Sequence, residues 1–284
     1  EPVAGGSRYL AAVRESRGRA PKGMLSVLSY AVSDPPMDIH QAQLKRQLLL
    51  HHTDIVCLQG INLFDRGAGL AATLREEGYG VASASTPDGE ANAIFWDQSR
   101  LRVVAREELG ADLALDLEPY EDPDASFRAV CVRPQVPTSS TPPLSRLINR
   151  GLQDGSPRRL IVCADLTLVG GVECASIVEE LAGMRSLPQE VLGAEILTPV
   201  SEPRAGGGSQ AVVAPASGLN RLHTPDGIFF EGLSPTLALS GHTERYIATM
   251  APEEVARQFP AFRIPIIAAF DWQAGAGGGP LGGG

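Results

Sequence analysis

The sequence lacks several patterns that would point directly to a function. It has four cysteines but no Cys-x-x-Cys pair, so a structural zinc site is not expected. No run of about 18 consecutive apolar residues occurs, and a membrane-spanning helix is therefore not expected. The glycine run 206–208 is not followed by Lys-Ser or Lys-Thr, which excludes the phosphate-binding loop of nucleotide hydrolases.

An excess of basic charge is also missing. The chain carries 24 Lys and Arg residues against 33 Asp and Glu residues, a formal net charge of −9. Proteins that hold a nucleic-acid backbone usually show a basic field, because phosphate neutralisation supplies much of the affinity. Nucleic acid is therefore not an expected partner. One basic stretch, residues 8–22, is compatible with an organellar address (mitochondrial or plastid) or with a solvated arm.

The cysteines fit a reducing compartment. Cys57, Cys131 and Cys163 lie inside apolar runs that are typical of strands, and the fourth is Cys174. Unpaired cysteines in such runs are usually buried thiols. We therefore expect an intracellular protein without disulfides.

The remaining composition predicts one large domain with two flanking segments. With 284 residues, 43% of them hydrophobic, the chain can bury a sizeable core. We expect an extended N-terminal arm over residues 1–22, a main domain over 23–273, and a glycine-rich tail over 274–284.

Helices and strands alternate along the main domain, which predicts an α/β sandwich. The expected strands are 25–32, 54–59, 91–96, 101–106, 127–133, 159–165, 228–230, 235–240 and 264–270. The expected helices are 39–52, 70–77, 144–153 and 173–183. Two Pro-, Gly- and Ser-rich segments, 134–143 and 199–220, are expected to be loops.

Four short motifs at strand ends carry a family resemblance: Leu-Gln-Gly at 58–60, Ala-Asp-Leu-Thr at 164–167, Asp-Gly-Ile-Phe at 226–229, and Ala-Phe-Arg-Ile-Pro at 261–265. In order and wording the chain resembles the endonuclease/exonuclease/phosphatase superfamily, and within it the nocturnin-like deadenylases, over roughly residues 24 to 272. The resemblance implies two packed β-sheets flanked by helices, a four-layer α/β/β/α arrangement. It also implies phosphoester cleavage with one or two Mg²⁺ ions, which prefer carboxylate and amide oxygens.

At the first two of the family's site positions, this chain departs from the pattern that the resemblance implies. Ala31 stands where the family has an asparagine, and Gly60 stands where it has its main metal-binding glutamate. Gln59, beside Gly60, has a carbonyl oxygen but points to the opposite face of its strand.

The later motifs depart in a similar way. Gln135 takes the place of a phosphate-contacting histidine, and Thr167 that of an asparagine. Phe262 and Arg263 replace the family's catalytic Asp-His pair. At most positions of the site that the resemblance implies, this chain therefore has no side chain suited to bind a metal ion.

Two site carboxylates, Asp165 and Asp226, are retained. Each also has a structural interpretation, since Asp165 can cap the turn after a strand and Asp226 lies in a Pro-Asp-Gly sequence typical of turns. Arg263 either pairs with one of them in place of the metal's charge, or lies at the rim.

The hypothesis that follows is a catalytically inactive relative of these nucleases, with no cofactor, acting as a structural or assembly subunit bound to other proteins. The alternative is a Mg²⁺-dependent phosphodiesterase or deadenylase with a rearranged site that uses Asp165 and Asp226, with Asp88 or Glu90. A third hypothesis is a module that holds a phosphate through Arg263.

Overall fold

The computed structural model describes nine stretches of the chain, and all that follows is confined to them. They are residues 20–32, 37–61, 68–85, 91–133, 145–149, 159–165, 184–186, 226–240 and 266–272.

One six-stranded sheet, here called sheet A, has the order β11-β12-β1-β2-β4-β3. Its strands are β1 (Met24–Ala31), β2 (Ile55–Gln59), β3 (Tyr79–Ser85), β4 (Ala91–Asp97), β11 (Ser234–Ser240) and β12 (Ile266–Asp271). β1 and β2 pair in parallel, and the other pairs are antiparallel. Both central strands are apolar runs that are buried on both faces, as expected where helices cover one side and a second sheet the other.

The second six-stranded sheet, sheet B, has the order β5-β6-β7-β8-β10-β9. Its strands are β5 (Leu101–Leu109), β6 (Asp112–Pro119), β7 (Phe127–Val132), β8 (Leu160–Asp165), β9 (Arg185–Ser186) and β10 (Asp226–Glu231). Here the central pair β7 and β8 is the parallel one. Each sheet therefore has a parallel pair at its centre whose strands end at the same edge.

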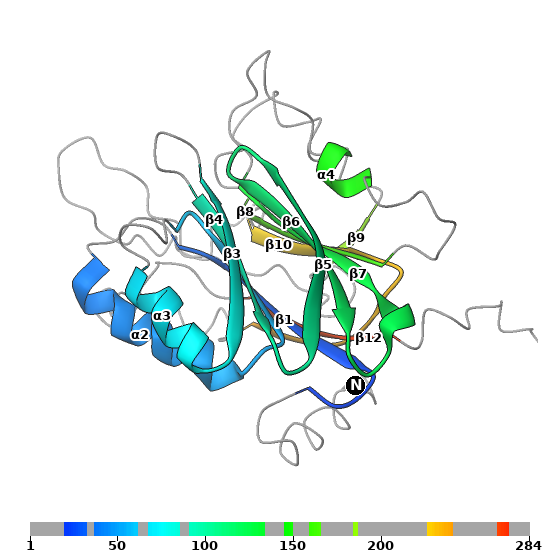
Figure 1. The fold of residues 1–284 in the computed structure, drawn as a ribbon, viewed down its shortest axis with the longest axis horizontal. Helices are drawn as coiled ribbons and strands as arrows, with labels where there is room; N and C mark the ends of the chain where they lie inside the picture. Colours follow the sequence, from blue (N-terminus) through cyan, green and yellow to red (C-terminus); the bar gives the residue numbers. More distant parts are fainter. Residues whose placement is uncertain are drawn as a thin grey trace, which may run out of the picture.

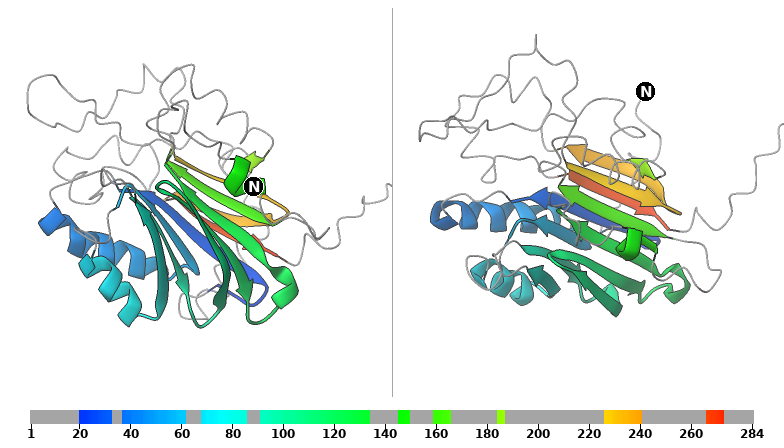
Figure 2. Two further views of the ribbon diagram at one scale, coloured as in Figure 1. Left: turned by 45° about the horizontal axis from the view of Figure 1, so that its top comes forward. Right: turned by 90° about the horizontal axis from the view of Figure 1, so that it is seen from above.

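The helices lie on the outer faces of the two sheets (Figures 1 and 2). On sheet A, α2 (Met37–His51) and α3 (Ala68–Glu76) place Leu44, Leu48 and Leu70 against the outward side chains of β1 and β2. On sheet B, α4 (Ser145–Asn149) places Leu147 against Val130 and Val162. The layers therefore follow the order α/β/β/α, which confirms the expected fold.

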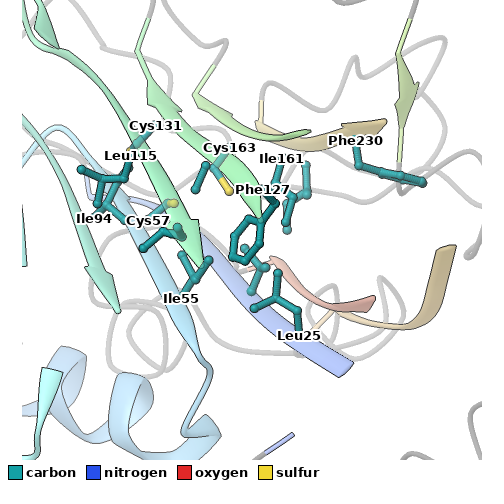
Figure 3. Close-up of a cluster of buried hydrophobic side chains, with 14 of the residues drawn as sticks. Leu25, Ile55, Cys57, Ile94, Leu115, Phe127, Cys131, Ile161, Cys163 and Phe230 are labelled. Carbon is teal, nitrogen blue, oxygen red and sulfur yellow. The ribbon is translucent and has the colours of Figure 1, made fainter. Parts of the chain in front are cut away.

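The main core fills the space between the sheets (Figure 3). Its members come from both sheets and include Leu25, Ile55, Leu115, Ile161 and Phe230, all essentially without exposed surface. Burying a side chain of this size stabilises the fold by about 1.5–3 kcal/mol. The α-helices α2, α3 and α4 lie outside this layer, whereas the short 3₁₀ helix η1 (Pro123–Ala125) contributes Ala125 to it. Packing in this layer holds the two sheets face to face.

Two buried arginines fasten chain segments to the sheets. Arg100 donates from Nη1 to Asp54 Oδ1 (2.6 Å) and from Nη2 to the Met24 carbonyl (3.0 Å), at the end of sheet A where β1 begins. Arg128 donates from Nε to the Leu147 carbonyl of α4 (2.6 Å), and pairs with Glu107 and Asp116 at 2.6 and 2.7 Å.

The edge strands β3 and β5 lie on the same side of the sandwich and are joined there. Arg106 of β5 donates from Nη2 to the Ser83 carbonyl of β3 (2.7 Å). β5 also has an irregular register between Val103 and Ala105, which leaves Val104 57% exposed. This side therefore presents charged residues and a bulge.

The expected strands are confirmed, with boundaries within a few residues, and so are the helices at 39–52 and 70–77. In the expected helix 144–153, the structure describes a helix over 145–149. The strands β3, β6 and β9 were not expected. The helix at 173–183, the loops 134–143 and 199–220, Cys174, most of the arm (1–19) and the tail lie outside the described residues. None of the described helices is long and apolar enough to cross a membrane.

Candidate functional site

The candidate site lies where the central parallel strands of both sheets end. β1 ends at Ala31, β2 is followed by Gly60, β7 is followed by Arg133, and β8 ends at Asp165. Side chains that follow the carboxyl ends of parallel strands gather at one edge, which is where α/β proteins commonly place ligands. In the family that the chain resembles, the metal ligands occupy this edge.

Gly60 has a backbone conformation that side chains rarely adopt. Its φ angle is +77°, and its N–H donates to Asn92 Oδ1 at 3.2 Å. A Cβ atom on Gly60 would lie 2.6 Å from Nη1 of Arg133 and 2.9 Å from the Val32 carbonyl oxygen. A side chain at position 60 would therefore need both a strained backbone and a displaced neighbour.

Arg133 forms an ion pair with Asp165, its Nε lying 3.2 Å from Oδ2. The Asp165 side chain is only 2% exposed, and that of Arg133 is 20% exposed. A buried carboxylate requires a compensating charge, and the guanidinium supplies it here. Arg133 is thus a charged partner of Asp165 among the described residues, and the expected pairing with Arg263 falls outside them.

A second set of contacts ties Arg133 to sheet A. The Arg133 N–H donates to Asp112 Oδ1 (3.0 Å), and Asn92 Nδ2 donates to the same oxygen (3.3 Å) and to the Ala111 carbonyl (3.0 Å). Asn92 is fully buried. The polar contacts therefore run from Gly60 through Asn92 and Asp112 to Arg133 and Asp165, and they cross from one sheet to the other.

Gln59 points between the sheets, below the site. Its Nε2 donates to Ser29 Oγ (3.2 Å) and to the Cys163 carbonyl (3.4 Å), and the residue is 1% exposed. Its Oε1 finds no hydrogen-bond partner among the described residues. Ala31, its partner in the β1–β2 register, contributes only a methyl group. Gln59 is therefore part of the inter-sheet packing.

The three thiols Cys57, Cys131 and Cys163 meet in the same layer (Figure 3). Hydrogen bonds with Cys131 and Cys163, together with burial, raise the pKa of Cys57 well above its ordinary value. Burial also raises the pKa of Cys131. The prediction of buried free cysteines is confirmed for these three, and the raised pKa keeps Cys57 and Cys131 protonated near neutral pH.

The structure corrects one expectation about Asp226. The Pro-Asp-Gly sequence suggested a turn, but Asp226 and Gly227 are the first residues of β10. They pair with Asp165 and Ala164 of β8. Although an Asp-Gly pair is typical of turns, pairing with β8 places these two residues in a strand. Asp165 and Asp226 are thus paired residues in the ladder between β8 and β10.

Four of the expected site positions lie outside the described residues: Gln135, Thr167, Phe262 and Arg263. Asp88 and Glu90, the additional acids of the alternative hypothesis, lie outside them as well. Across the described stretches, no group of three or more His, Cys, Asp or Glu side chains is arranged to hold a metal ion.

Sequence reasoning missed Arg133, Asn92 and Asp112. Arg133 directly follows a buried strand, just as Asp165 ends one, and this shared position was the available signal. Asn92 lies opposite Gln59 in the β2–β4 register, which the sequence alone does not give. Asp112 belongs to β6, a strand that was not expected.

Comparisons with known proteins give results at the level of structure. No protein-family model matches the chain, and no curated protein matches its sequence. Solved structures do match. The human nocturnin catalytic domain with bound sulfate is 18% identical, with a TM-score of 0.60 over 87% of this chain and 93% of that one.

Two other solved structures match over similar lengths. ANGEL2, a 2′,3′-cyclic phosphatase bound to adenosine-2′,3′-vanadate, is 17% identical, with a TM-score of 0.58 over 87% of this chain and 95% of that one. A humanised D. rerio TDP2 is 14% identical, with a TM-score of 0.57 over 88% and 99%. At these identities the likeness shows the fold alone, and it confirms the fold on which the predicted resemblance rests.

Proposed function

We infer that this chain, which has the endonuclease/exonuclease/phosphatase fold, is a catalytically inactive member that serves as a structural or assembly subunit. The main observation behind this inference is that the Arg133 guanidinium lies close to the backbone of Gly60. The position that would supply the main metal ligand has no side chain, and a guanidinium lies against it. In this proposal the chain retains the two-sheet fold but has different side chains at the edge where enzymes of this fold bind metal.

The described residues do not fit a magnesium ion. Mg²⁺ requires near-octahedral oxygen coordination and gives up its water reluctantly, so it needs well-placed carboxylates. Gly60 and Ala31 offer no side-chain oxygen, and Asp165 already has the positive charge of Arg133 beside it. A divalent cation would have to displace that charge.

The local charge also disfavours a phosphate substrate. Asp165 pairs with the guanidinium of Arg133, and Asp112 accepts a hydrogen bond from the main-chain N–H of the same residue. Phosphoryl transfer depends on positive groups that stabilise the charge of the transition state. A site whose described cation is already paired with a carboxylate provides little of this stabilisation. It also argues against the third hypothesis, of a phosphate-holding module, as far as the described residues extend.

The proposal of a protein partner rests on what the chain retains. Both six-stranded sheets, their central parallel pairs and the covering helices are intact, so the fold can present surfaces without performing chemistry. The net charge of −9 favours proteins over nucleic acid as partners. Mass measurement of the native protein isolated from its source would test this, since an isolated monomer would contradict a subunit role.

An activity assay tests the catalytic half of the proposal. The wild type should show no turnover above background with poly(A) RNA, a 2′,3′-cyclic nucleotide or an abasic duplex, in Mg²⁺ or in Mn²⁺. The control is the double variant Asp165→Ala/Asp226→Ala, measured beside it. Turnover by the wild type that the double variant lacks would refute the proposal.

That result would instead support the alternative, a Mg²⁺-dependent phosphodiesterase with a rearranged site. The observation in its favour is that Asp165 and Asp226 are backbone partners in the β8–β10 ladder.

A further inference from the structure

Three of the four cysteines meet in the layer between the two sheets (Figure 3). Cys57 comes from β2 of sheet A, whereas Cys131 and Cys163 are register partners on the neighbouring strands β7 and β8 of sheet B. Each is at most 1% exposed and is a free thiol. Among the described residues no three such groups are arranged to hold a metal ion, so pairwise oxidation to a disulfide is the relevant chemistry.

The two sheets approach each other closely at Cys131. Its Sγ atom lies 3.5 Å from the Leu58 carbonyl oxygen of the facing strand β2, and Gln59 Nε2 is equally close to it. Packed sheets are usually about 10 Å apart, and a disulfide requires Cα atoms within about 7 Å of each other. Here Cα atoms of β2 and β7 come within 8 Å, so only a small further approach is needed.

We propose that Cys57 and Cys131 form a reversible disulfide that fastens sheet A to sheet B under oxidising conditions. Neither the inactive-subunit function nor the enzymatic alternative requires this covalent modification, so it is independent of both. The bond closes a long loop that contains the strands β3, β4, β5 and β6. A cross-link across so long a loop restricts the unfolded chain, and it therefore stabilises the folded sandwich.

The contacts favour Cys131 over Cys163 as the partner of Cys57. The sulfur of Cys131 lies against both Leu58 and Gln59, the two residues that follow Cys57 in β2. Gln59 meets Cys163 at the main-chain carbonyl instead, at 3.4 Å. The Cys57 and Cys131 thiols are also hydrogen-bonded to each other, so their sulfur atoms are already neighbours before oxidation.

The reaction needs an oxidant, for which a low-molecular-weight disulfide is sufficient. Burial raises the pKa of Cys131, whereas hydrogen bonds with Cys57 and Gln59 act in the opposite direction. Once deprotonated, Cys131 attacks one sulfur of the small disulfide, and the other sulfur leaves as a thiolate that takes up the proton. Cys57 then loses its own proton, attacks the Cys131 sulfur and expels the second small thiol. Two protein thiols and one small disulfide thus become one protein disulfide and two small thiols.

Burial makes this exchange slow in the closed sandwich, because both thiols are shielded from solvent. It proceeds when the sheets separate transiently, or during folding before they close. The same burial then protects the finished bond from reduction. The cross-link is therefore expected to respond to sustained oxidation and not to a brief exposure.

The test measures the effective concentration of the Cys57–Cys131 pair in glutathione buffers of graded redox ratio. Samples start from the folded full chain and from the chain refolded out of urea in the same buffer, and a third set stays in concentrated urea. Peptide mass spectrometry after acid quenching assigns the disulfides. The effective concentration should be at least about 100-fold higher in the folded protein than in urea, which corresponds to a Tm about 5–10 °C higher for the oxidised than for the reduced protein.

Single variants separate this pair from the other cysteines. Cys57→Ala and Cys131→Ala should lose the rise in Tm on oxidation, whereas Cys163→Ala and Cys174→Ala should keep it. Each variant is compared with its own reduced form, so the cost of the cavity that alanine leaves cancels. If a variant does not fold, the disulfide assignment in the wild type decides the question alone.

A folded protein that forms no Cys57–Cys131 disulfide at any glutathione ratio would overturn the proposal. So would a disulfide that joins Cys57 to Cys163 or involves Cys174, or a rise in Tm that persists in Cys131→Ala. These outcomes are separate from those that test the proposed function. Turnover by the wild type, or isolation as a monomer, would refute the inactive-subunit function without changing the disulfide result.

Discussion

The guanidinium of Arg133 lies where a side chain on Gly60 would have to begin: its Nη1 atom is 2.6 Å from the position of the missing Cβ. The two residues follow central strands of different sheets, β2 and β7. The two segments therefore approach each other at the edge where the central strands of both sheets end. A Cβ atom at position 60 would also lie 2.9 Å from the Val32 carbonyl oxygen, so this position has little room for a side chain.

The first prediction concerns this lack of room. Gly60→Ala should destabilise the protein by about 2–4 kcal/mol, because it combines a strained φ with a contact too short to persist. Gly78→Ala is the matched control, since Gly78 has a φ of +89° but nothing within 4 Å of the position that a Cβ atom would occupy. It should cost only about 1–2 kcal/mol. Urea unfolding of both variants measures the difference, and equal costs would show that the Arg133 contact yields freely.

A second prediction compares a buried arginine with an exposed one. Arg128→Met should cost about 3–5 kcal/mol, because it leaves Glu107 and Asp116 without their cation and the Leu147 carbonyl without its donor. Arg102→Met removes an arginine that is 55% exposed and paired with Glu118, and should cost no more than about 1 kcal/mol. Urea unfolding of both variants measures the loss of stability from the shift in the denaturation midpoint, provided that the m-value is unchanged. Similar losses for the two variants would contradict the role given to Arg128.

The third prediction concerns the buried thiols. In the native protein Cys57, Cys131 and Cys163 should resist alkylation by iodoacetamide at pH 8, because they are inaccessible and, for Cys57 and Cys131, because the raised pKa leaves little thiolate. All three should react in urea. Peptide mass spectrometry assigns the modified residues, and fast labelling of Cys57 in the folded protein would be incompatible with this core.

The fourth prediction is a pH effect at the end of α2. Burial lowers the pKa of His51 below its ordinary value of 6.5. The folded protein therefore binds a proton less readily at His51 than the unfolded chain does, so His51 contributes most to stability above pH 6.5 and that contribution declines as the pH falls below it. His51→Gln should lose less stability than wild type between pH 7.5 and 5.5. Urea unfolding at both pH values measures this, and identical losses would rule out the effect.

The strands at the centre of each sheet were predictable, whereas the edges and the site contacts were less so. The run at 25–31 is mostly apolar and the run at 160–164 is apolar throughout, as expected of strands covered on both faces. β6 was missed although Leu113, Leu115 and Leu117 alternate with smaller or polar residues. Alternation of this kind was the available signal for a strand with one core-facing side.

The replacement of ligands at positions 31 and 60 could be seen in the sequence through the family resemblance. The ion pair at Asp165 could not, because it depends on β7 lying parallel to β8, with Arg133 just beyond the end of one strand and Asp165 at the end of the other. The order of residues along the chain does not specify which strands become neighbours. Arg263 was therefore considered as a partner for this aspartate, and Arg133 was overlooked.

The contact between Arg106 and the Ser83 carbonyl affects how the edge strands β3 and β5 can meet a strand of another chain. Open strand edges recruit other strands, and crowding many copies together makes such recruitment more frequent. Here β5 carries both arginine and glutamate side chains and an irregular register, and one carbonyl of β3 already accepts a hydrogen bond. These two edges are therefore poor templates for a strand of another copy, which protects this side of the sandwich from aggregation by sheet extension.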